Sequence, residues 1–194
     1  DDYYNDPKKM GYDLALCISN EVKALSEAGC QYIQIDEPVF ARKPDETHDY
    51  GMENLERAMH GILKETQRAC HICCGYPNSL DSEHYKKADL DAYDKIADLV
   101  EDSSIDEVSL EDSHRPLDLK LLEKFKKTNV IMGLIDVAKS RVESVEEVQK
   151  RIREVLGHID EERLIAAPDC GLGFFDRDQA KQKMQILSKA VKNF

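Results

Sequence analysis

The stretch HICCGYPN, residues 71–78, ends a candidate β-strand with a histidine and two cysteines and continues at once into a loop. Its strand, CHICC (70–74), is one of five short apolar runs that are each followed by a turn or loop. The other four are YIQID (32–36), IDEVSLE (105–111), NVIMGLIDV (129–137) and RLIAA (163–167). Short runs of this kind, rich in β-branched residues and bounded by turn residues, predict strands.

Amphipathic segments lie before, between and after these runs and predict helices. They are LALCISNEVKALSEAG (14–29), MENLERAMHGILKET (52–66), DAYDKIADLVED (91–102), PLDLKLLEKFKK (116–127), SVEEVQKRIREVLG (144–157) and DQAKQKMQILSKAV (178–191). Ser144 followed by Glu147 predicts a capping box at the start of one of them. The alternation predicts an α/β chain whose strands are parallel and joined by right-handed crossovers.

The carboxyl ends of the candidate strands carry groups that can do chemistry. These groups are Asp36 and Glu37, His71 and Cys73, Glu111 and Asp112, Asp136, and Asp169 and Cys170. Sites in (β/α)₈ barrels and in open parallel sheets are built at this edge. Five strands cannot close a barrel that needs eight strands and about 250 residues. We therefore expect either three further strands before residue 1, in a longer polypeptide, or an open sheet.

Composition narrows the class of protein. The net charge of −12 disfavours nucleic acid and anionic membranes as partners, because both attract clustered Lys and Arg. The sequence has no apolar run of about 18 residues and no charged-then-apolar leader, so we expect a cytoplasmic protein with no membrane partner. Its six cysteines are then expected to be free thiols or metal ligands rather than a disulfide framework.

The residues of the opening stretch leave two interpretations open. Side chains two positions apart on a strand share a face, so His71 and Cys73 point one way while Cys70 and Cys74 point the other. A packed core histidine beside a small cysteine is one interpretation. The other is a zinc site completed by Glu111 and Cys170, because zinc takes such nitrogen, sulfur and oxygen ligands. Spacing alone does not choose between the two.

Five motifs together carry a resemblance to a known family. QIDEP (34–38), HICC (71–74), SLEDS (109–113), GLIDV (133–137) and PDCGLG (168–173) occur in this order. In this respect the chain resembles the catalytic domain of cobalamin-independent methionine synthase, within the wider group that also contains uroporphyrinogen decarboxylase-like barrels. The resemblance implies a zinc-bearing (β/α)₈ TIM barrel, with residues 1–194 matching its last five βα units as the C-terminal part of a single catalytic domain.

The resemblance also implies an activity and roles for named residues. It implies methyl transfer to a thiol, expected to be homocysteine, which would give methionine. It makes His71, Cys73, Glu111 and Cys170 the zinc ligands. Asp36 would hold the amino group of the amino-acid thiol.

Two departures from the family pattern bear on the methyl donor. Ala138 stands where the family has a histidine thought to donate a proton, and Arg42 stands where it has a glutamate that contacts a folate donor. His114 is a candidate substitute for the proton donor, the alternative being an exposed loop histidine. The donor is thus expected to be a folate or a corrinoid. The alternative functions are alkyl transfer to another thiol, a metal-free decarboxylase, and a non-catalytic barrel fragment. Oligomeric state is not predicted.

Overall fold

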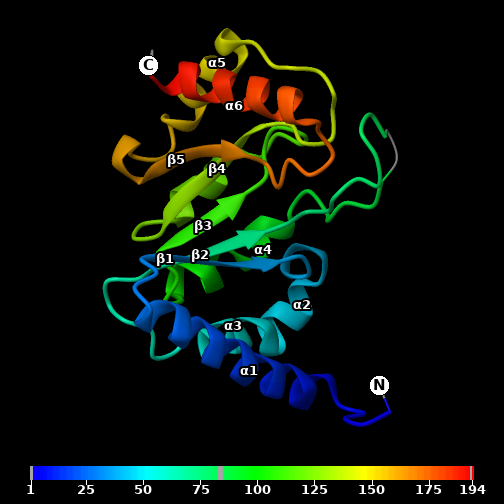
Figure 1. Ribbon diagram of the computed structural model, residues 1–194, viewed down its shortest axis with the longest axis vertical. Helices are drawn as coiled ribbons and strands as arrows, with labels where there is room; N and C mark the ends of the chain where they lie inside the picture. The colour runs from blue at the N-terminus through cyan, green and yellow to red at the C-terminus, as the bar shows by residue number, and fades with distance from the viewer. Residues whose placement is uncertain (1, 83–84, 193) are drawn as a thin grey trace.

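The computed structural model describes residues 2–82, 85–192 and 194, and its centre is a parallel sheet (Figure 1). The strands are β1 (Tyr32–Glu37), β2 (Gln67–Ile72), β3 (Glu107–Leu110), β4 (Asn129–Ile135) and β5 (Leu164–Pro168). They lie in chain order, β1-β2-β3-β4-β5, and every neighbouring pair is parallel. All five strands coincide with the runs predicted from sequence. β1 and β5 form the two edges of this sheet.

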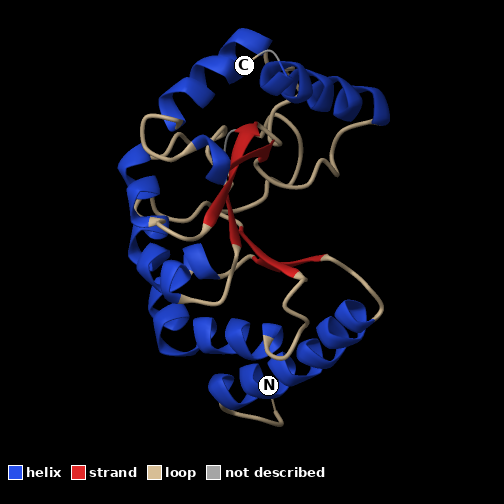
Figure 2. Ribbon diagram, turned by 90° about the vertical axis from the view of Figure 1, so that its left-hand side faces the viewer, coloured by secondary structure: helices blue, strands red, loops and turns tan. Residues whose placement is uncertain are grey.

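The helices lie along one side of the curved sheet (Figure 2). They are α1 (Pro7–Glu27), α2 (Pro44–Glu46), α3 (Met52–Met59), α4 (Ala92–Asp102), α5 (Val145–Val155) and α6 (Arg177–Lys192), with 3₁₀ or π turns at Phe40–Arg42, Thr47–Gly51, Leu119–Lys124 and Glu161–Arg163. Among the described residues no helix covers the concave side of the sheet. A parallel sheet in chain order with helices outside is a segment of a (β/α)₈ barrel, which confirms the predicted fold class.

The core lies between the sheet and these helices. Outward-facing strand residues such as Ile72, Val108 and Met132 are almost fully buried there, together with Tyr93 of α4 and Ile152 of α5. Burial on this scale removes apolar surface from water, which is the main stabilising contribution to folding. On edge strand β1 the alternate residues on the other side remain exposed, as the alternating burial of this strand shows.

Two predicted helices are shorter or tighter than the sequence suggested. The segment 52–66 is helical only to Met59, because His60 is extended and Gly61 adopts a φ of +77°. The segment 116–127 forms a 3₁₀ turn rather than an α-helix, since Asp118 and Phe125, which flank it, are both extended. Buried Leu121, Leu122 and Phe125 anchor this short connection. Amphipathic spacing alone does not reveal where a chain must turn back to the sheet.

One predicted helix start is confirmed, and another helix is longer than predicted. Ser144 accepts a hydrogen bond from the Glu147 amide and Glu147 accepts one from the Ser144 amide, so the predicted capping box is confirmed. α1 begins at Pro7 after the capping residue Asp6, seven residues earlier than predicted. Cys17 of α1 is exposed. No helix in the described part of the chain is long and apolar enough to cross a membrane.

Candidate metal centre

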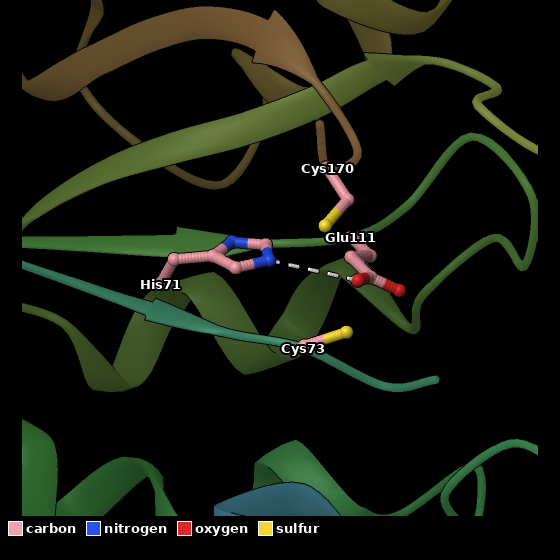
Figure 3. Close-up of side chains that lie close together, drawn as sticks. All are labelled: His71, Cys73, Glu111 and Cys170. Carbon is pink, nitrogen blue, oxygen red and sulfur yellow. Dashed lines mark ion pairs between the residues drawn. The ribbon is translucent and has the colours of Figure 1, made fainter. Parts of the chain in front are cut away.

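Four predicted ligands converge at the carboxyl ends of three strands (Figure 3). His71 belongs to β2, Cys73 follows that strand, Glu111 follows β3 and Cys170 follows β5. One ligand atom from each residue lies within 4.8 Å of every other. The parallel register explains why the ends of β1, β2 and β3 lie together, because it places Asp36, His71 and Ser109 side by side across these strands. The four residues that the sequence motifs singled out are therefore brought together.

A hydrogen bond to one nitrogen of the His71 ring fixes the ring, and the other nitrogen faces the remaining ligands of the cluster. Nδ1 lies 2.9 Å from the Ser109 hydroxyl oxygen in a buried hydrogen bond. Nε2 lies 3.7 Å from Oε1 of Glu111. Neither Nε2 nor Oε1 has a hydrogen-bond partner among the described residues, although both are buried. Buried polar atoms without partners are rare, and a bound ion is one recognised explanation.

The four clustered groups shift one another's pKa values, because their ligand atoms lie within 4.8 Å of one another. The hydrogen bond between the two cysteines, together with burial, raises the pKa of Cys73 to about 12. The same hydrogen bond lowers the pKa of Cys170. Burial and the neighbouring Cys73 raise the pKa of the Glu111 carboxyl to about 9. Burial pulls the pKa of His71 down, but Cys73 and Glu111 outweigh it and the net shift is upward. Acidic groups this close together resist losing their protons, and a cation bound among them would favour their ionised forms.

The donor set and its spacing fit zinc. A tetrahedral zinc ion with nitrogen, sulfur and oxygen ligands about 2.0–2.3 Å away has ligand atoms about 3.3–3.8 Å from one another. The present atoms need only a small contraction from their 4.8 Å limit to reach that geometry. One imidazole, two thiols and a carboxylate supply four ligands of the types that zinc binds. The residues present therefore fit the ion that the sequence motifs implied.

His114 lies against this cluster, so its reading as an exposed loop histidine is wrong. Its side chain is only 3% exposed. Nδ1 lies 2.8 Å from Asp169 and Nε2 lies 3.5 Å from Oε2 of Glu111. Sequence reasoning placed Asp169 at a strand end but missed its contact with His114, which joins residues 55 positions apart. The role of Ser109 behind His71 was also missed.

The remaining predicted residues lie outside the four-ligand cluster. Asp36 is exposed at the end of β1, on the face that carries His71, and accepts a hydrogen bond of 2.8 Å from Gln34. Arg42 turns back to donate to the carbonyl oxygen of Pro38. Ala138 is buried in the loop after β4 and contributes only its backbone groups there, the amide to Asp136 and the carbonyl to Asp81. Cys70 and Cys74 are buried in the core, as their position on the opposite face predicted.

Comparison with known proteins agrees with these observations. Residues 4–193 match the family described as "Cobalamin-independent synthase, Catalytic domain". Proteins named methionine synthase from Thermococcus kodakarensis and Pyrococcus abyssi are 35% and 33% identical over 98% of this chain and 51% of their own length. A B12-independent methionine synthase from Shewanella sp. W3-18-1, solved with selenomethionine, superposes with a TM-score of 0.88 at 32% identity, covering 99% of this chain and 56% of that one. The chain thus spans about half the length of the curated relatives it matches.

Proposed function

The chain belongs to the cobalamin-independent methionine synthase family, and from that premise we propose that it forms part of a zinc-dependent methyltransferase. The proposed reaction moves a methyl group to the sulfur of homocysteine and gives methionine. The observation that carries the proposal is the cluster of His71, Cys73, Glu111 and Cys170 at the strand ends. Since the relatives are about twice as long, we also propose that residues 1–194 are the C-terminal part of one barrel.

The cluster would hold the zinc ion through these four side chains. Zinc, when bound, would lower the pKa of a coordinated substrate thiol so that the thiolate persists at neutral pH. A free thiol has a pKa near 8.5 and is only slightly ionised at that pH. The task of the protein is to hold the ligand atoms in place. Ser109 does so for His71, because its hydrogen bond to Nδ1 leaves Nε2 directed at the cluster.

Asp36 supports the proposal that the acceptor is an amino-acid thiol. Its carboxylate is exposed on the same face of the sheet as His71, which is its register partner on β2. A carboxylate in this place can bind the ammonium group of an amino acid whose sulfur reaches the cluster. Its hydrogen bond from Gln34 holds one oxygen and leaves the other free to accept. Charge-assisted hydrogen bonds of this kind are among the stronger polar interactions.

The proposed methyl donor is a methylated folate. The corrinoid alternative drawn from the sequence finds no support, because the matched family and the solved relative are named as independent of cobalamin or B12. Ala138 offers no proton donor in its loop. The role of His114 as a substitute proton donor stays a prediction, and both nitrogens of its ring face carboxyl groups of the protein.

Metal analysis with matched variants tests the proposal. The protein expressed from its complete coding sequence should hold about one zinc per barrel by elemental analysis. Cys73→Ser and Cys170→Ser should each lose most of that zinc, whereas Cys17→Ser, which changes an exposed thiol on α1, should keep it. The unsubstituted protein should form methionine from homocysteine and a methylated folate. Protein with reduced thiols that neither contains nor takes up zinc would refute the proposal.

A further inference from the structure

The ring of His114 lies between two buried carboxylates. On one side Nδ1 is 2.8 Å from Oδ2 of Asp169, and on the other Nε2 is 3.5 Å from Oε2 of Glu111. Glu111 is 2% exposed and Asp169 is fully buried. Each ring nitrogen of His114 therefore faces a carboxyl oxygen, Nδ1 at hydrogen-bond distance and Nε2 at ion-pair distance.

Asp169 is a rigid support for this ring. Its Oδ1 accepts the backbone N–H groups of Asp112 and Ser113, both at 2.9 Å. Its Oδ2 accepts the backbone N–H of His114 at 2.8 Å in addition to the ring contact. Gly133 of β4 makes room for it, because a Cβ there would lie 2.7 Å from the Asp169 Cα. With Asp169 fixed by these contacts, Nδ1 is committed to it and Nε2 can only face Glu111.

The two oxygens of Glu111 are divided between two neighbours. Oε1 faces Nε2 of His71 at 3.7 Å and Oε2 faces Nε2 of His114. Within the part of the chain that the structure describes, the His114 Nε2 has no hydrogen-bond partner, although it is buried. Glu111 Oε2 lies at ion-pair distance from it. An interaction there would fix the rotation of the carboxylate and keep Oε1 directed at the other three ligands.

We propose that His114 is a positioning residue that, supported by Asp169, orients Glu111 toward His71, Cys73 and Cys170. This inference rests on the proposed zinc site. Polar groups behind metal ligands commonly contribute about 10- to 100-fold to metal affinity, because they fix the ligand's orientation and basicity. The role differs from that of a proton donor to the substrate, because both ring nitrogens face carboxylates of the protein and the side chain is 3% exposed.

Two substitutions distinguish the contact that His114 makes through Nδ1 from the one that it makes through Nε2. His114→Asn keeps an amide near the position of Nδ1, where it can still contact Asp169, but has no atom at the position of Nε2. His114→Gln can place its amide near Nε2 and so contact Glu111. Zinc affinity of the complete protein, measured by competition with a chromophoric chelator, should fall about 10- to 100-fold in His114→Asn and stay close to the original in His114→Gln. Circular dichroism checks that each variant is folded.

A second readout reports the ligand geometry without activity. Cobalt substituted for zinc should show an altered visible spectrum in His114→Asn and an unchanged one in His114→Gln. Equal zinc affinity of folded His114→Asn and unsubstituted protein would overturn the inference alone. If His114→Asn does not fold, a tenfold loss of zinc affinity in folded His114→Gln would overturn it. Failure of the unsubstituted protein to bind zinc would instead overturn the proposed function, and the inference with it.

Discussion

Replacing Gly133 by alanine should disturb the site without changing any residue that touches substrate or metal. The added Cβ would lie 2.7 Å from the Asp169 Cα and closer still to its Oδ1. Real Cβ atoms essentially never make contacts under 3.0 Å, so the neighbouring atoms must move. Asp169 is fully buried, so it cannot rotate into solvent to avoid the methyl group. The Asp169 side chain must shift within the core, away from the three backbone N–H groups that donate to it and from Nδ1 of His114.

The cost follows from these contacts. Overpacking a buried position costs about 1–3 kcal/mol, and one weakened hydrogen bond to a charged group adds about 1.5–3 kcal/mol. We expect Gly133→Ala to lower the free energy of unfolding by about 3–5 kcal/mol in urea titrations followed by circular dichroism. Gly171→Ala is the matched control, because a Cβ there meets no atom within 4 Å, and it should change stability little. Gly133→Ala with the stability of the unsubstituted protein would refute the reasoning.

Two further predictions concern a buried ion pair and the cluster. Lys183 is fully buried with Nζ 3.0 Å from both Glu143 oxygens, so Lys183→Met should cost about 3–5 kcal/mol in the same titration by leaving a buried charge unpaired. A loss under about 1 kcal/mol would contradict this. Zinc affinity should rise with pH between 6 and 8 and be lost as pH falls, because the raised pKa values of Cys73 (about 12) and Glu111 (about 9) mean that both hold protons which zinc must displace. Chelator competition at several pH values should show about a tenfold change per unit for each displaced proton, and a flat profile would argue against it.

The strands were predictable because their signal is local. Each is a short apolar run followed by turn residues, and each run contains or overlaps an observed strand. Helix ends were predictable where a capping pair marks them, as at Ser144 and Glu147. Helix length was not predictable where the chain turns back to the sheet, as after Met59, because the required positive φ of Gly61 depends on the loop as a whole.

The site was predictable in part for a similar reason. The two-residue period of a strand correctly put His71 and Cys73 on one face and Cys74 on the other. Glu111 and Cys170 were candidates from their positions at strand ends, but only the resemblance to a family favoured the zinc site over a packed histidine, since spacing does not fix which strand ends meet. The burial of the His114 ring depends on Asp169, 55 residues away in sequence. Asp169, directly before Cys170, and Gly133 of the GLIDV strand are the residues in the sequence that could have indicated a buried carboxylate beside the site.

The parallel sheet has a consequence for the order in which the molecule assembles. No two neighbours among the five described strands can pair by closing a short hairpin, because all are parallel, and register partners such as Asp36 and His71, or His71 and Ser109, are separated by a whole crossover of about 35–40 residues. Such non-local pairing is slow, since loop-closure entropy is lost before the contacts form. Cys170 follows β5, whereas His71 lies in β2 and Cys73 directly follows β2. The four ligands therefore come together only once β2, β3 and β5 all have their places in the sheet, so that tight capture of a metal ion reports an assembled sheet rather than directing its first strand pairing.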